Sequence, residues 1–201
     1  MMRIDHWIKN ILLFPGIAFA IIILKSHFSF QTLISCFLGF LITCIASSAN
    51  YLINEYLDSE TDAFHPIKRN RASVQKKANV YVVISLYLVL VFFTSALSIL
   101  VLRNSIFTFC LILYFLLAII YNVKPFRAKD LVYLDVIIES ANNPIRIILG
   151  WVLIDSKTIP PFSILISFWG IGIFLMSAKR LSEVKSLKRK IDLETIGNYR
   201  K

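Results

Sequence analysis

The chain alternates between long apolar stretches and shorter polar ones. Its apolar segments are long enough, at roughly 20 residues each, to cross a hydrocarbon core of about 30 Å as helices. Six such segments lie near residues 8–25, 30–57, 79–102, 105–122, 131–154 and 159–178. The pattern predicts an all-α fold, a polytopic transmembrane bundle of about six membrane-spanning helices. We expect residues 1–201 to form a single integral membrane domain.

The composition agrees with a membrane environment. Hydrophobic residues make up 57% of the 201 residues, and the mean hydropathy is +0.71. These values are too high for an ordinary water-soluble domain. A net charge of +10 could suggest nucleic acid, but the cations lie between the predicted spans rather than along one soluble face. We therefore expect the lipid bilayer as a partner and no nucleic acid.

The cations are divided unequally between the two sides of the predicted bundle. On one side, the N-terminal segment, the two long loops and the tail carry 18 Lys and Arg residues together. On the other side, only Lys25, Arg103 and Lys157 occur. Cytoplasmic loops of membrane proteins carry an excess of Lys and Arg. We expect a multi-pass protein of the cell inner membrane, with its active-site loops and both termini in the cytoplasm.

The second apolar segment ends in a polar stripe. Asn50, Asn54, Asp58 and Asp62 follow one another at steps of four residues, so on a helix they share one face. Ionisable groups in a membrane helix are functional candidates, and carboxylate and amide oxygens are ligands that Mg²⁺ prefers beside substrate phosphates. The stripe predicts a Mg²⁺ site. The alternative is a solvated helix end whose charges pair with the basic loop that follows.

A basic run, "HPIKRNR", comes directly after the stripe. Its cations are suited to bind phosphate oxygens that the metal leaves uncovered. We assign Lys68 and Arg71 to substrate binding on this ground.

These two motifs resemble the signature of the UbiA-type intramembrane prenyltransferases. In that family an Asn and aspartates at four-residue spacing end the second helix, and a His-Pro pair with basic residues follows. This chain reads "NEYLDSETD" and then "HPIKRNR", with Glu55 where many members have Asp and Ala72 where a Pro is common. The resemblance implies a Mg²⁺-dependent transferase in which diphosphate departs next to an isoprenoid substrate.

Three further motifs resemble the polyprenyl-phosphate phosphoribosyltransferase-like branch of that family. They are "HWIKN", "YNVKPFRAKDLVYLD" and "SAKRLSE", which holds a Lys-Arg-x-x-Glu pattern. Together with the stripe they complete the set of candidate site residues. We expect catalytic roles for Asp58, Asp62, Lys124 and Arg146, metal ligation by Asn54, Asp58, Asp62 and Glu183, and substrate binding by Lys9, Asn10, Asn50, Lys68, Arg71, Tyr121, Arg127, Lys129, Lys179 and Arg180. Each loop cation could instead only orient the chain in the membrane.

An arginine lies deep in the fifth apolar segment. Arg146 follows Glu139 on the same helical face, and an arginine at this depth needs a partner or a cavity. An ion pair with Glu139 and a contact with substrate are both compatible with the spacing. The sequence Asn142-Asn143-Pro144 between them predicts a break or kink, because proline removes a helical donor.

The patterns leave the reaction open among several alternatives. The donor is either a prenyl diphosphate that alkylates an acceptor, or phosphoribosyl diphosphate attacked by a polyprenyl phosphate. The chain could also be a non-catalytic lipid-binding or assembly protein, or, with less support, a transporter. Because members of the family usually have about nine helices, we expect this chain to be incomplete after its sixth, which leaves room for a homo-oligomer or for partner helices.

Overall fold

The structure is a computed structural model that describes residues 4–63, 74 and 79–190. In these ranges every regular element is helical, which confirms the predicted all-α fold. The elements are η1 (Ile4–Leu12), α1 (Leu13–Leu24), α2 (Phe30–Leu57), α3 (Ser59–Asp62), α5 (Val80–Leu97), η3 (Ser98–Leu102), α6 (Ser105–Asn122), η4 (Ala128–Asp130), α7 (Val132–Ser140), α8 (Asn142–Val152) and α9 (Phe162–Lys190).

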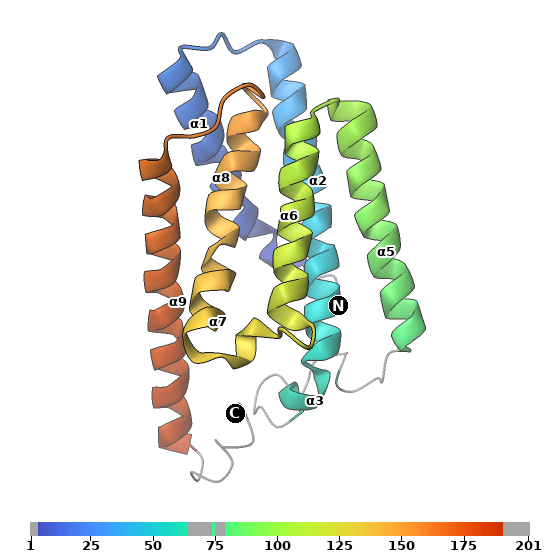
Figure 1. The fold of residues 1–201 in the computed structure, drawn as a ribbon, viewed down its shortest axis with the longest axis vertical. Helices are drawn as coiled ribbons and strands as arrows, with labels where there is room; N and C mark the ends of the chain where they lie inside the picture. The colour runs from blue at the N-terminus through green and yellow to red at the C-terminus, as the bar shows by residue number, and fades with distance from the viewer. Residues whose placement is uncertain (1–3, 64–73, 75–78, 191–201) are drawn as a thin grey trace.

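Most of the predicted membrane spans are continuous helices. Among the described residues, five helices are long and apolar enough to cross a membrane: His6–Leu24, Phe30–Leu57, Val80–Leu102, Ser105–Asn122 and Phe162–Lys185. The remaining predicted span, residues 131–154, is not one helix but two, α7 and α8. They follow one another through the bundle (Figure 1).

The break between α7 and α8 occurs where the sequence predicts it. Pro144 lies in the first turn of α8, where a backbone N–H has no acceptor within the helix, so its missing donor costs little. The side-chain amide of Asn142 donates to the carbonyl oxygen of Glu139 at 3.0 Å. This bond satisfies one of the carbonyls at the end of α7 that has no partner within the helix.

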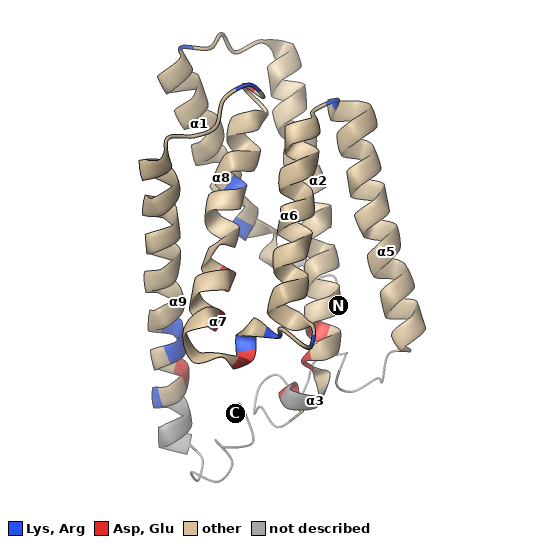
Figure 2. Cartoon of the chain, in the orientation of Figure 1, with Lys and Arg blue, Asp and Glu red and all other residues tan. Residues whose placement is uncertain are grey.

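Successive predicted spans run in opposite directions, and the two ends of the bundle differ in their connections and in their charged residues. Figure 1 shows the connections 25–29, 103–104 and 153–161 at one end, and α3, the loop 123–131 and the last turns of α9 at the other. Most Lys, Arg, Asp and Glu residues gather at this second end, which we call the polar end (Figure 2). The three connections at the opposite end carry only isolated charges.

Side-chain caps fix where several helices begin. The hydroxyl of Ser29 accepts from the Thr32 N–H at 3.1 Å, and the amide oxygen of Asn104 accepts from the Phe107 N–H at 2.9 Å. Such caps satisfy donors that the first turn leaves without partners. Asn104 also donates to the carbonyl of Val152 at 2.7 Å, so the start of α6 is tied to the end of α8.

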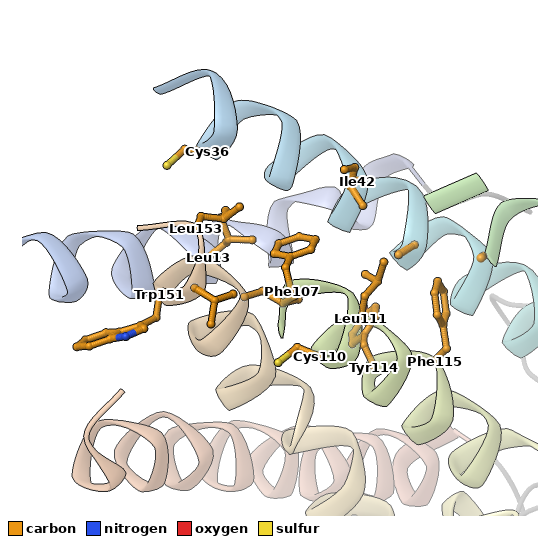
Figure 3. Close-up of a cluster of buried hydrophobic side chains, with 14 of the residues drawn as sticks. Leu13, Cys36, Ile42, Phe107, Cys110, Leu111, Tyr114, Phe115, Trp151 and Leu153 are labelled. Atoms are coloured by element: carbon orange, nitrogen blue, oxygen red, sulfur yellow. The ribbon is translucent and has the colours of Figure 1, made fainter. Parts of the chain in front are cut away.

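The core joins α1, α2, α6 and α8. Figure 3 shows Leu13, Phe107, Leu111 and Trp151 among its buried side chains. Within this core the backbones of α1 and α8 touch, because a Cβ atom at Gly16 would overlap the carbonyl oxygen of Ile147, and one at Gly150 would overlap that of Leu13. Only glycine allows this approach. The contact holds the N-terminal segment against the helix that carries Arg146.

Candidate functional site

A cavity of about 140 Å³, which we call the polar cavity, opens near the polar end. Its walls come from η1, α2, α6, η4, α7 and α9, and among the described residues that line it only Met176 has a side chain without a polar or charged group able to form hydrogen bonds. Many of the residues proposed from the sequence line it together. They are Lys9, Asn54, Asp58, Tyr121, Lys129, Lys179, Arg180 and Glu183.

Two further cavities adjoin the polar cavity. The first, the apolar cavity, has a volume of about 480 Å³ and lies between η1, α7, α8 and α9. Aliphatic side chains such as Ile11 and Leu175 form much of its wall, with cations at Lys9, Arg146 and Lys179. The second, the inner cavity, has a volume of about 40 Å³ and is lined by residues that include Asn50 and Arg146.

The other proposed site residues have different surroundings. Asp62 is buried, with 3% of its surface exposed, but it does not line the polar cavity. Lys124 is exposed and lies outside that lining as well. Arg127 contacts Asp58, with 3.9 Å between Nη2 and Oδ1. Lys68 and Arg71 lie outside the described residues.

The helical spacing of the polar stripe continues past the end of α2. Helix α2 ends at Leu57, yet the N–H of Asp58 donates to the Asn54 carbonyl at 2.9 Å, and that of Asp62 to the Asp58 carbonyl at 2.7 Å. The helical spacing is therefore kept across the boundary. Asn50 faces the inner cavity, Asn54 faces both the inner and the polar cavity, and Asp58 faces the polar cavity.

Lys129 provides the positive charge beside the stripe. Its Nζ donates to Asp58 Oδ1 at 2.5 Å and to Asn122 Oδ1 at 3.0 Å, and only 4% of the residue is exposed. Burial lowers the pKa of the Lys129 ammonium, and the Asp58 carboxylate opposes that shift. The pair links the loop after α6 to the end of α2.

A second charged cluster joins α6, α7 and α9. Arg180 binds Asp135 with two hydrogen bonds, from Nε at 2.6 Å and from Nη2 at 2.9 Å, and Glu183 through Nη1 at 2.8 Å. The Tyr121 hydroxyl donates to Asp135 Oδ1 at 2.6 Å. Bidentate pairs of this kind fix geometry as well as charge. Asp135 is thus the centre of the cluster.

Arg146 is held by neutral groups. Its Nε donates to Asn10 Oδ1 at 3.0 Å and its Nη2 to the Tyr114 hydroxyl at 3.0 Å. Ser47 donates to Asn10 Oδ1 at 3.1 Å and lies 2.9 Å from the Tyr114 oxygen, which closes a ring of four side chains. Arg146 and Glu139 are both described and form no ion pair, so that alternative is wrong.

Ser47 and Tyr114 are the members of this ring that the sequence did not reveal. Ser47 lies beside Ser48 and Tyr114 lies within an apolar run, and nothing in the local spacing separates them from packing residues. Their role depends on contacts between helices that lie far apart in the chain.

Oxygen ligands suited to a metal face the polar cavity. In the part of the chain that the structure describes, no three His, Cys, Asp or Glu side chains gather closely enough to hold a metal ion by themselves. However, Glu55, Asp58 and Glu183 all line the cavity beside cations, and Glu55 Oε2 is buried without a hydrogen-bond partner. This donor set fits Mg²⁺, which usually takes one or two carboxylates and completes its shell with water and phosphate.

Comparison with known proteins identifies the family. The sequence matches the UbiA prenyltransferase family over residues 12–197. The chain belongs to the UbiA prenyltransferase family. The resemblance drawn from "NEYLDSETD" and "HPIKRNR" is therefore confirmed. As a UbiA family member with several helices able to cross a bilayer, it is an integral membrane protein.

The chain is also similar to two curated proteins. It is 27% identical over 186 residues to decaprenyl-phosphate phosphoribosyltransferase from Corynebacterium glutamicum, a match that covers 91% of this chain and 53% of that protein. It is 30% identical over 152 residues to the uncharacterized protein y4nM from Sinorhizobium fredii, covering 76% of this chain and 28% of that protein. The chain thus spans about half or less of the length of these curated relatives.

Proposed function

We propose that the protein is a Mg²⁺-assisted transferase that breaks a carbon–oxygen bond to diphosphate next to an isoprenoid substrate. The observation that carries this proposal is the polar cavity, where carboxylates from α2 and α9 face cations from η1, η4 and α9. A metal diphosphate needs both kinds of group in one place, because the carboxylates bind the metal and the cations bind the remaining phosphate oxygens.

The residues divide this work by their position. Asn54 and Asp58 are the best placed ligands for the metal, since both face the polar cavity at the end of α2. Mg²⁺, when bound, supplies positive charge to the departing diphosphate. Lys9 from η1 and Lys179 from α9 would bind phosphate oxygens, and Lys129 would share its charge between Asp58 and the substrate. Asp62 and Glu183 remain proposed ligands, although Asp62 does not line the cavity and Glu183 binds Arg180.

The apolar cavity suits the isoprenoid. Its aliphatic wall, formed by residues such as Ile8, Ile11 and Leu12, keeps water away from a reactive cation. The apolar and polar cavities share Lys9, Glu139, Met176 and Lys179, so a lipid in one and a diphosphate in the other would meet at this boundary.

The lining of the polar cavity suits a sugar diphosphate as donor. A prenyl diphosphate would place its diphosphate in the same cavity and its chain in the adjoining apolar cavity, so both donors are compatible with the two cavities. A phosphoribosyl diphosphate would find hydrogen-bonding groups throughout. A polyprenyl phosphate acceptor would then lie in the apolar cavity with its headgroup near Lys9, Arg146 and Lys179. The relative from Corynebacterium glutamicum carries the name of this reaction, and prenyl transfer is the second candidate because the family is named for it.

The proposed orientation of the protein in the membrane follows from the positions of its Lys and Arg residues. We place the polar end in the cytoplasm of a cell with this protein in its inner membrane, because Lys and Arg gather at that end (Figure 2). Soluble diphosphate donors made in the cytoplasm would then reach the polar cavity directly.

The experiment uses membranes that contain the protein and has two arms: a polyprenyl phosphate with labelled phosphoribosyl diphosphate, and an aromatic acceptor with labelled prenyl diphosphate, with the label followed into the product that joins donor and acceptor. We expect label to enter lipid in a Mg²⁺-dependent way, and Asp58→Asn to lower the rate about 100-fold or more because a charge that supports the leaving group is lost. Asp155→Asn, which removes the same charge at the opposite end of the bundle, is the matched control.

The donor that delivers label decides between the two reactions. Label from phosphoribosyl diphosphate alone supports the ribosyl reaction, and label from prenyl diphosphate alone supports prenyl transfer. An unchanged rate in Asp58→Asn would refute the metal role of this carboxylate. Bound lipid without transfer from either donor would favour the non-catalytic alternative.

A further inference from the structure

One carboxylate borders all three cavities. Glu139 lies in the last turn of α7, is half-buried, and lines the polar, the apolar and the inner cavity. Among the described residues, it is the only carboxylate that lines the apolar cavity or the inner cavity. A ligand atom that passes from the polar cavity to the apolar one must therefore come near it.

The bonding of this carboxylate differs from that of the other carboxylates around the polar cavity. Over residues 4–63, 74 and 79–190, no side chain forms a hydrogen bond or an ion pair with the Glu139 carboxylate. Asp58, Asp135 and Glu183, by contrast, each pair with a Lys or Arg at 2.5 to 2.8 Å. The cations Lys9 and Lys179 share two cavities with Glu139 and still do not engage it.

The backbone around Glu139 is fixed even though its carboxylate is not engaged. Its carbonyl oxygen accepts from the Asn142 side chain at 3.0 Å, across the break between α7 and α8. One turn earlier, Asp135 is anchored by Arg180 and Tyr121. The side chain therefore projects from a defined point, which is a condition for electrostatic catalysis by a preorganised charge.

We propose that the Glu139 carboxylate stabilises the positive charge that develops on the reacting carbon at the boundary of the polar and apolar cavities. This inference rests on the proposed function. The bond between that carbon and the diphosphate oxygen breaks, and its electron pair leaves with the diphosphate. A lone pair of the acceptor then forms the new bond to the carbon. No electron is gained or lost overall, and Glu139 exchanges no proton when the acceptor is a phosphate.

The role is the same for either donor. A ribosyl donor gives an oxocarbenium-like carbon and a prenyl donor an allylic cation, and both carry positive charge at the point where diphosphate departs. An anion placed next to that point lowers the energy of the transition state without binding the neutral ground state more tightly. Glu139 thus acts on the rate constant more than on donor binding.

The first test measures binding and needs no turnover. The purified protein in lipid nanodiscs receives Mg²⁺ and pyrophosphate, and then one of two ammonium probes: geranylgeranylamine or a hydroxylated pyrrolidine of ribose shape. Each is compared with its uncharged oxygen counterpart. We expect at least one ammonium probe to bind wild-type protein about tenfold or more tightly than its counterpart, since the charge resembles that of the transition state.

Three variants make this comparison specific. Glu139→Gln keeps the shape of the side chain and should abolish the preference for the charged probe, whereas Glu139→Asp should retain part of it. Asp155→Asn, which removes a carboxylate at the far end of the bundle, should leave it unchanged. Mn²⁺ binding, followed by electron paramagnetic resonance, should be the same in Glu139→Gln and wild type.

The outcomes separate this inference from the proposed function. No preference in the wild type, a preference that persists in Glu139→Gln, or loss of Mn²⁺ binding in that variant would each overturn the role of Glu139. In the transfer assay, Glu139→Gln should lower kcat about 100-fold with little change in KM for the donor. If the wild type transfers label but binds the ammonium probes no more tightly than their uncharged counterparts, only the role of Glu139 is overturned. If it prefers the ammonium probes but transfers label from neither donor, only the proposed function is overturned.

Discussion

Two arginines lie at the centre of polar clusters in this molecule, and their charges have different kinds of partner. Arg180 binds Asp135 through two nitrogens and Glu183 through a third, so its charge is balanced within the protein. Arg146, with 4% of its surface exposed, is bound by the neutral side chains of Asn10 and Tyr114. Both clusters join helices that are distant in the chain.

The difference shows which charge is structural and which is available to a ligand. A buried ion pair that loses one partner leaves an uncompensated charge, so Arg180 is tied to the integrity of the α7–α9 contact. A cation among neutral groups in a membrane protein is costly and is typical of a functional position. Because Arg146 also lines the apolar and inner cavities, its free charge faces the space where we place the lipid headgroup.

The largest expected effect on stability comes from breaking the balanced cluster. Arg180→Gln leaves the buried carboxylate of Asp135 without its cation and should lower the free energy of unfolding by about 3–5 kcal/mol. Thermal unfolding of the purified protein in detergent measures the loss. The double variant Arg180→Gln/Asp135→Asn should recover most of it, and an unchanged single variant would show that the pair does not support the fold.

A smaller effect is expected at the other arginine. Arg146→Gln removes a charge that no carboxylate in the described part of the chain neutralises, so the cost is that of lost hydrogen bonds, about 1–3 kcal/mol. The same variant should weaken binding of a polyprenyl phosphate about tenfold or more, relative to the corresponding alcohol, in a nanodisc binding assay. Equal losses of stability in Arg146→Gln and Arg180→Gln would contradict the distinction between the two clusters.

Effects on stability similar to or smaller than that of Arg146→Gln should come from the hydroxyl groups of the two clusters. Tyr121→Phe removes a hydrogen bond to the charged Asp135 and should cost about 1.5–3 kcal/mol, whereas Ser47→Ala removes bonds between neutral groups and should cost about 1 kcal/mol. Chemical unfolding of both variants under one condition compares them. A larger loss for Ser47→Ala would show that the ring around Arg146 is more important for stability than its neutral partners suggest.

Local patterns in the sequence predicted the framework of both regions. The apolar runs predicted the helices because length and hydropathy are local properties, and the steps of four residues placed Asn54 and Asp58 on one face. The break near Pro144 was also foreseen, since proline acts on its own helix. This break divides the segment 131–154 into two shorter helices, α7 and α8.

The side-chain contacts between different helices could not be predicted from local sequence patterns. Arg146 has Glu139 within reach on its own face, but its partners Asn10 and Tyr114 belong to η1 and α6. Similarly, Lys124 and Lys129 belong to one loop and look equivalent in sequence. The turn at Arg127, with a positive φ of 28°, and the η4 helix after it bring Lys129 to Asp58 while Lys124 remains exposed.

The close glycine contact between α1 and α8 determines which wall of the apolar cavity can move. With Gly16 against Ile147 and Gly150 against Leu13, these two backbones cannot part without losing their packing. Helix α9 instead meets its neighbours through side chains, such as the Trp169 indole that donates to the Ile137 carbonyl. A lipid tail that enters sideways from the bilayer would therefore displace α9, while Asn10 and Arg146 stay in register on the rigid side of the passage.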